Sequence, residues 1–201
     1  MQDGSGSRIA ALQQKIGGRA KAAGRPFLVV IDGPSGAGKS TLARALAGCL
    51  PATVVEGDDF FIGGVGIRDE DPASLAATCI DWRAQRVVLA QLLSLRDAEF
   101  HPFDWDRFDG SRTVTAKRLS ANPVIILEGV YSNRPELRDL VDYAVLVMAS
   151  KLCRRQRLIA RGETIGPWET QWHRAEDWYF RHLAPPDAFD FIIDDADCPD
   201  P

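Results

Sequence analysis

Residues 33–41 read Gly33-Pro34-Ser35-Gly36-Ala37-Gly38-Lys39-Ser40-Thr41, which fits the pattern G-x-x-x-x-G-K-S. The apolar run over 27–32 before it predicts a buried strand, and residues 39–49 after it have the apolar spacing of a helix. A strand, a glycine-rich turn and a helix in this order are the context in which the pattern forms a P-loop. The alternative is a glycine-rich turn with an incidental lysine, and the two flanking elements count against it.

The P-loop predicts a site for the phosphates of a nucleoside triphosphate. Its glycines let the backbone curl so that successive N–H groups point inward, and the following helix adds the positive end of its dipole. We therefore expect all nine residues of 33–41 to bind nucleotide. Lys39 would reach the outer phosphates, and the Ser40 hydroxyl would be a ligand of Mg²⁺. The cofactors that this motif implies are ATP and Mg²⁺.

The pattern of apolar segments predicts a three-layer α/β/α fold with a mainly parallel sheet, as in P-loop NTPases. Helical patterns alternate with short apolar runs that predict strands, at 53–56, 124–127, 143–148 and 189–193. We expect an N-terminal helix within 1–25 that is part of the same domain, and a single P-loop domain over 26–198. A small helical lid is predicted at about 151–183.

Composition excludes several classes of protein. The formal net charge of −4 over 201 residues predicts no broad basic surface for nucleic acid. The longest apolar runs are of strand length, so we expect no membrane span, and the N-terminus lacks the apolar segment of a signal peptide. The cysteines, Cys49, Cys79, Cys153 and Cys198, are widely scattered, which predicts reduced thiols in a cytoplasmic protein.

Two acids follow predicted strands and so are expected at the edge of the sheet where ligands bind. Asp58 could accept the proton of a substrate hydroxyl as that oxygen attacks phosphorus. The alternative is an aspartate that only caps its own loop, and the residues alone leave the two open. Glu128 ends an apolar strand, as in a Walker B segment, which predicts that it supports the Mg²⁺ site.

Three arginines at i, i+3 and i+7 share one face of a predicted helix over 151–161. Their guanidinium groups could neutralise the oxygens of a transferring phosphate. We expect Arg154 to contact nucleotide and Arg157 and Arg161 to act in catalysis. The alternative is a solvated basic face.

Acids and aromatic rings between the P-loop and residue 124 predict the site of the second substrate. Asp81, Phe103 and Trp105 are candidates, because carboxylates bind hydroxyls and flat faces pack on rings. A hydrophobic cluster beneath a long loop is an equally good interpretation. Trp168 and Trp172 are expected to pack in the core rather than against a ligand.

Together these motifs resemble the uridine kinase-like family of P-loop kinases, which is related to phosphoribulokinase and pantothenate kinase. The resemblance runs over about 27–194 and includes the segments Asp58-Asp59-Phe60-Phe61 and Glu128-Gly129. It implies transfer of the γ-phosphate of ATP to a hydroxyl of a small molecule. It also implies that Asp58 is the catalytic base, that Asp81 holds ribose hydroxyls and that Gln171 lines the nucleoside site.

The segment that recognises the pyrimidine departs from the family pattern. The family has a histidine after P-x-Y-D-F, whereas this chain has Pro102-Phe103-Asp104-Trp105 and no histidine between it and the predicted strand at 124–127. The acceptor therefore stays open between a uridine-like nucleoside, a sugar, a vitamin precursor and a nucleoside monophosphate. A nucleotide-binding switch is a rival, although the N-K-x-D guanine reader is absent from the sequence. A homo-oligomer is also left open.

Overall fold

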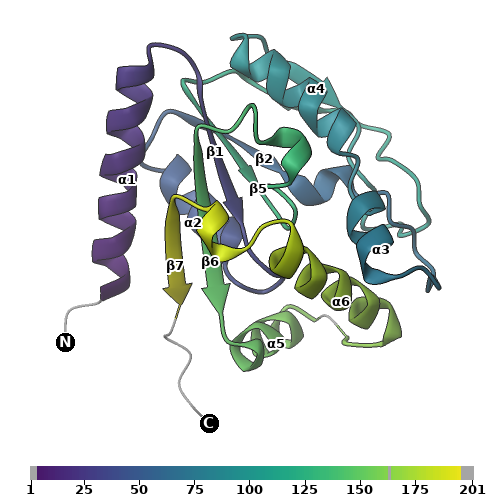
Figure 1. Ribbon diagram of the computed structural model, residues 1–201. Helices are drawn as coiled ribbons and strands as arrows, with labels where there is room; N and C mark the ends of the chain where they lie inside the picture. The colour runs from purple at the N-terminus through teal and green to yellow at the C-terminus, as the bar shows by residue number, and fades with distance from the viewer. Residues whose placement is uncertain (1–3, 163, 196–201) are drawn as a thin grey trace.

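A five-stranded parallel sheet forms the centre of the computed structural model, which describes residues 4–162 and 164–195 (Figure 1). The strand order is β2-β5-β1-β6-β7, and each neighbouring pair is parallel. The strands are β1 (Phe27–Asp32), β2 (Ala52–Glu56), β5 (Val124–Glu128), β6 (Tyr143–Ala149) and β7 (Phe191–Asp195). The prediction of a mainly parallel sheet is confirmed, and the last strand lies two residues later than expected.

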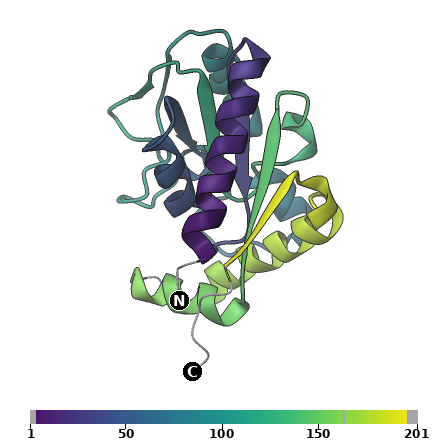
Figure 2. The ribbon, with the colours of Figure 1, turned by 90° about the vertical axis from the view of Figure 1, so that its left-hand side faces the viewer.

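Helices cover both faces of this sheet. Every residue of β1 and β5 is therefore buried, whichever face its side chain points to. Phe27, Val29 and Ile31 pack in one apolar cluster with α1 and α2, whereas Leu28 and Val30 point to the opposite cluster. Figure 1 shows α1 on one side of the strands and α3 and α4 on the other, and Figure 2 shows α1 lying across the strands. The helices are α1 (Gly4–Ala23), α2 (Lys39–Ala47), α3 (Pro72–Thr78), α4 (Trp82–Leu93), α5 (Lys151–Ala160) and α6 (Pro167–His182).

Two helices, α3 and α4, follow β2 along the chain, and each has an aspartate at its N-cap. Asp71 accepts hydrogen bonds from the N–H groups of Ala73 and Ser74, at 2.9 and 3.1 Å. Asp81 accepts one from the N–H of Ala84 at 3.0 Å. These contacts satisfy amide groups that the first turn of a helix leaves without a partner.

A small antiparallel hairpin, β3 (Ala98–Phe100) and β4 (Lys117–Leu119), lies apart from the main sheet. It belongs to the segment that joins α4 to β5. The described helices include none with the length and apolar character needed to cross a membrane. Three of the cysteines, Cys49, Cys79 and Cys153, lie among the residues that the structure describes, and they form no disulfide there. The fourth, Cys198, lies outside the described residues.

The turn after β1 requires glycine at its first position, which gives a testable prediction. Gly33 has a φ of +146°, and a Cβ added there would lie 2.1 Å from the carbonyl oxygen of Val147 in β6. We expect Gly33→Ala to lower the free energy of unfolding by more than about 2 kcal/mol. Urea denaturation measures this loss.

Gly64→Ala is the matched control for the Gly33 variant. Gly64 also has a positive φ, +87°, but an added Cβ meets no atom within 4 Å. Only the backbone strain remains, which predicts a loss of about 1 kcal/mol. Equal losses for the two variants would mean that the close approach to β6 does not matter.

Candidate active site

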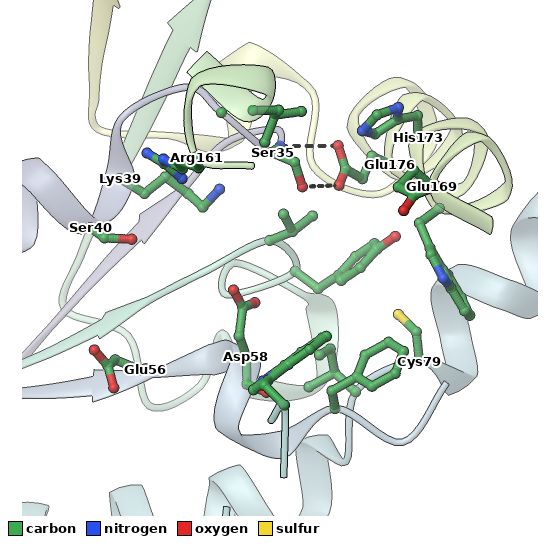
Figure 3. Close-up of a pocket in the computed structure, with 18 of the residues that line it drawn as sticks. Ser35, Lys39, Ser40, Glu56, Asp58, Cys79, Arg161, Glu169, His173 and Glu176 are labelled. Carbon is green, nitrogen blue, oxygen red and sulfur yellow. Dashed lines mark hydrogen bonds between the residues drawn. The ribbon is translucent and has the colours of Figure 1, made fainter. Parts of the chain in front are cut away.

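A cavity of about 810 Å³ lies beyond the carboxyl ends of β1, β2 and β5. Figure 3 shows Lys39, Ser40 and Arg161 on one side of it, Asp58 below, and His173 and Glu176 on the helix opposite. We call the part formed by Ser35, Gly36, Lys39, Ser40, Arg161 and Glu128 the phosphate end. The rest contains the rings of Phe61, Trp105, Phe108, Tyr131, Trp168 and Trp172, and we call it the aromatic chamber.

The P-loop at the phosphate end has a tightly curled backbone. Gly33, Gly36 and Gly38 all have positive φ, and the N–H of Ala37 donates to the Pro34 carbonyl at 3.1 Å. Gly38 is the N-cap of α2 and has no side chain to cap the first turn. The N–H groups of that turn are therefore available to an anion, which the helix dipole also favours.

Lys39 lies at the start of α2 with only 8% of its surface exposed. Its Nζ donates to the Pro34 carbonyl at 3.2 Å, so the ammonium folds back over the P-loop. Its positive charge lowers the pKa of both Asp58 and Glu128, although burial acts more strongly in the opposite direction. The ammonium is thus placed between a phosphate socket and two carboxyl groups.

Asp32 at the end of β1 anchors the P-loop from beneath, a role that the sequence did not reveal. Its buried carboxylate accepts from the N–H groups of Gly33, Tyr131 and Asn133 and from the Tyr179 hydroxyl, at 2.8–3.1 Å. Burial raises the pKa of Asp32 to about 6, while these donors act in the opposite direction. The single signal in the sequence is an acid that ends an otherwise apolar strand.

Asp58 occupies the short 3-10 helix Gly57–Phe60 that follows β2. Its side chain is exposed to the cavity, as Figure 3 shows, but protein surrounds that cavity closely enough to raise the pKa of the carboxyl. The charges of Glu176 and Asp59 raise it further, and Lys39 opposes them. A carboxylate with a raised pKa is a better proton acceptor at neutral pH than an ordinary aspartate.

The neighbouring acid Asp59 has a different environment. The ammonium of Lys117 in β4 lies 2.7 Å from Asp59 Oδ2 and also pairs with Glu56 at the end of β2. The Lys117 charge offsets both acids and ties the hairpin to this edge of the sheet. Of the adjacent aspartates, Asp58 is therefore the one presented to the cavity.

Glu128 and Ser40 form the part of the phosphate end that fits a divalent cation. Burial together with the Asp58 charge raises the pKa of Glu128 to about 7, while Lys39 and the Ser40 hydroxyl act in the opposite direction. A cation would relieve this concentration of negative charge. The described residues contain no cluster of three acidic, histidine or cysteine side chains for a metal. The Ser40 hydroxyl and the Glu128 carboxylate suit Mg²⁺, because this cation prefers oxygen ligands, takes few of them from protein and completes its shell with phosphate oxygens and water.

Glu128→Gln should stabilise the ligand-free protein above neutral pH. The pKa of Glu128 is raised to about 7 in the folded protein and is lower in the unfolded chain. The protonated carboxyl therefore stabilises the fold fully at a pH below the unfolded-state pKa, and this stabilisation is lost as the pH rises through 7. At pH 8 the buried charge therefore costs stability, and removing it should raise the free energy of unfolding by about 1–3 kcal/mol.

Urea denaturation at pH 8 and pH 5 measures this effect. The gain from Glu128→Gln should shrink at pH 5, where wild-type Glu128 is mostly protonated. Glu99→Gln removes an exposed carboxylate that pairs with Arg118, so it should change little at either pH. A gain from Glu128→Gln of the same size at both pH values would contradict the argument.

The arginines of α5 lie against the P-loop rather than on a face directed only to solvent. Arg154 Nη1 lies 3.4 Å from the carbonyl oxygen of Ser35, and Arg157 Nη1 lies 3.2 Å from that of Ala37. Arg161 follows at the end of α5 and lines the cavity. Their side chains thus surround the loop at which phosphates would bind.

Of the residues predicted to hold the second substrate, the structure brings Asp58 and Trp105 to the cavity wall. Asp81 instead caps α4, and Phe103 is buried behind Phe61 and Trp105 with ring centroids 5.1 and 4.7 Å away. Gln171 accepts from the N–H of Arg68 at 2.9 Å, so it fastens the loop after β2. The wall does not include these three, because each already satisfies a local structural need.

Helix α6 contributes several residues that the sequence did not indicate. Trp168 and Trp172 pack on Phe61, as expected of core residues, and they also line the aromatic chamber. His173 and Glu176 line it from the same helix. The spacing of 168, 172 and 176 places these residues on one helical face, which was the available signal.

Comparisons with known proteins agree with this architecture. No model of a protein family matches the chain. Uridine-cytidine kinase C of Dictyostelium discoideum is 26% identical over 132 residues, which are 64% of this chain and 28% of that protein. The match thus spans little more than a quarter of that relative.

Among solved structures, a possible uridine kinase of Bacillus stearothermophilus has a TM-score of 0.64 at 20% identity and covers 92% of this chain and all of its own. D-glycerate 3-kinase of Cryptococcus neoformans has a TM-score of 0.59 at 14% identity, over 93% of this chain and 89% of its own. The chain therefore has the three-layer fold of the uridine kinase-like P-loop kinases that its motifs resemble.

Proposed function

We propose that this protein transfers the γ-phosphate of Mg·ATP to a hydroxyl group of a small molecule. The observation that carries the proposal is that Lys39 and Asp58 face one cavity, with the P-loop at one end and the aromatic chamber at the other. An acid between a phosphate socket and a second pocket is the arrangement that phosphoryl transfer to an alcohol requires.

The P-loop would hold the triphosphate through the N–H groups of its turn and of the start of α2. Lys39 would neutralise the outer phosphates as a point charge. Ser40 and Glu128 would hold Mg²⁺, which when bound offsets negative charge on the phosphate oxygens. Arg161 is placed to neutralise the equatorial oxygens of the transferring group, with Arg154 and Arg157 beside it.

Asp58 would act as the base. As the acceptor oxygen forms its bond to the γ-phosphorus, the bond from that phosphorus to the bridging oxygen breaks and ADP leaves. The proton of the acceptor hydroxyl would pass to the Asp58 carboxylate. The neighbouring Asp59 would not compete for it, because its carboxylate is paired with Lys117. Residues 151–183, which include α5 and α6, would act as the lid that excludes water, because an open site would hydrolyse ATP.

Other assignments within the same fold change the acceptor and keep the chemistry. A sugar, a vitamin precursor or a nucleoside monophosphate would use the same P-loop and the same base. A nucleotide-dependent regulatory switch would need the P-loop and not the chamber. The second pocket is therefore what favours an enzyme.

The test is a panel of acceptors incubated with Mg·ATP, with ADP release measured above the background without acceptor. Uridine, cytidine, pantothenate and simple sugars belong in the panel. We expect at least one of these to raise ADP release, and calorimetry to show binding of Mg·ATP. A protein that binds no Mg·ATP would not support the proposal.

A further inference from the structure

Glu176 of α6 lies where the phosphate end meets the aromatic chamber, with 4% of its surface exposed. One carboxylate oxygen accepts from the N–H of Ser35 at 3.0 Å, and the other accepts from the Ser35 hydroxyl (Figure 3). Arg154 Nη1 forms a long ion pair with this carboxylate at 3.9 Å, which offsets part of its charge. These contacts hold a negative charge in the wall of the chamber at a fixed place.

The charged groups around the chamber are mostly acidic. Asp58 faces Glu176 across the cavity, and Glu169 lines it one turn beyond His173. Lys39 and Arg161 belong to the phosphate end, where a triphosphate would engage them. In the described part of the chain the chamber itself is lined by no lysine or arginine, and the imidazole of His173 is its basic group.

The remaining wall of the chamber is aromatic. The ring centroid of Phe61 is 5.1 Å from that of Trp105 and 5.5 Å from that of Trp172, and Phe108 lies 5.2 Å from Trp168. Such a wall binds a flat or apolar group by burial, and its π faces attract a cation. An anion gains nothing from these rings and is repelled by the acids.

Building on the proposed function, we propose that Glu176 selects the acceptor by charge. The chamber accepts an alcohol that carries a ring and is uncharged or positively charged, and it rejects hydroxy acids and phosphate esters. The repulsion is strong because an anion in the chamber would lie close to both Glu176 and Asp58 with little water to screen it. D-Glycerate 3-kinase shares the fold and is named for an anionic substrate, so this chain is expected to differ from it in specificity.

Three ribosides that share their ribose hydroxyls test the proposal: uridine is neutral, orotidine adds a carboxylate to the ring, and nicotinamide riboside carries a cationic ring. Calorimetry with Mg·ADP present gives each dissociation constant. We expect orotidine to bind at least about tenfold more weakly than the other two. Equal or tighter binding of orotidine than of uridine would overturn the proposal, as would a failure of all three to bind.

Glu176→Gln isolates the role of the charge. The amide has nearly the same size, and it can accept from the N–H of Ser35 while donating to the Ser35 hydroxyl oxygen. We expect the ratio of orotidine affinity to uridine affinity to rise by about tenfold in this variant. A purely structural role would weaken all three ligands by the same factor and leave the ratio unchanged, which would overturn the assignment.

Asp177→Asn is the matched control, because it removes the same charge from the next position of α6. The Asp177 carboxylate pairs with Lys151 at 3.0 Å and does not line the cavity. The ratio of orotidine affinity to uridine affinity should stay at the wild-type value in this variant. A rise equal to that of Glu176→Gln would show that the position of the charge in the cavity wall does not matter, which would overturn the assignment to Glu176. Calorimetry with Mg·ATP, run in parallel, distinguishes the proposed kinase function from the selection of the acceptor by charge. If Mg·ATP does not bind, the kinase function is wrong. If Mg·ATP binds but orotidine binds as well as uridine, only the charge selection is wrong.

Discussion

Lys39→Ala is expected to lower kcat by about three orders of magnitude. The ammonium is the positive charge that the P-loop itself supplies at the phosphate end, and it lies in a largely buried position where water screens it little. Its removal also leaves Asp58 and Glu128, the proposed base and the proposed Mg²⁺ ligand, without the charge that lowers the pKa of both, so each would be protonated more readily. Steady-state ADP release with the best acceptor measures the loss, and thermal unfolding checks that the variant is folded.

Arg44→Ala is the control for this experiment. Arg44 lies on the same helix α2, but its side chain is exposed on the surface and is not part of the cavity wall. The substitution Arg44→Ala removes one positive charge, as Lys39→Ala does, but at a position away from the P-loop. We expect kcat to stay within about twofold of wild type, because exposed charges are well screened. Turnover of Lys39→Ala at the level of Arg44→Ala would show that the ammonium takes no part in transfer.

Asp58→Asn is expected to lower kcat by about 10²–10⁴-fold while Mg·ATP still binds. The amide keeps the shape of the side chain and cannot take the proton of the acceptor hydroxyl. Single-turnover measurement of ADP formation with acceptor present reports the transfer step, and calorimetry reports nucleotide binding. Asp139→Asn, which alters an exposed carboxylate paired with Arg86, should leave both quantities unchanged. Full turnover by Asp58→Asn would mean that another group accepts the proton.

The pH profile gives a second check on Asp58. The carboxylate must be ionised to accept a proton, so kcat/KM should rise with pH across the acid limb. Because burial and the nearby acids raise the pKa of Asp58, this limb should lie above the range of an ordinary aspartate. A limb at the usual aspartate position would indicate that the cavity does not enclose the carboxyl in the working enzyme.

Much of the fold and half of the site could be predicted because the relevant signals are local. The P-loop is a contiguous pattern whose flanking strand and helix are read from their own periodicity. Asp58 lies two residues beyond the end of β2 and Glu128 is the last residue of β5, and parallel strands bring their carboxyl ends to one edge of the sheet. Position along the chain was therefore enough to place both acids near Lys39, and the structure agrees.

The acceptor side could not be predicted, because it depends on how separate elements pack. Asp81, Phe103 and Gln171 are the residue types that bind sugars and rings, yet local capping, core packing and loop anchoring already use them. Their types alone do not distinguish these uses.

Helix α6 shows what the amino-acid order determined and what tertiary structure decided. Residues 168, 172 and 176 are spaced at four, which places Trp168, Trp172 and Glu176 on one face of any helix they form. Whether that face meets the core, the solvent or a cavity depends on where α3 and the P-loop lie, and these are separated from α6 by about half the chain or more. Local sequence thus determined the P-loop and the two acids beside it, whereas only the packing of α6 against the P-loop set a carboxylate and a row of rings around the second pocket.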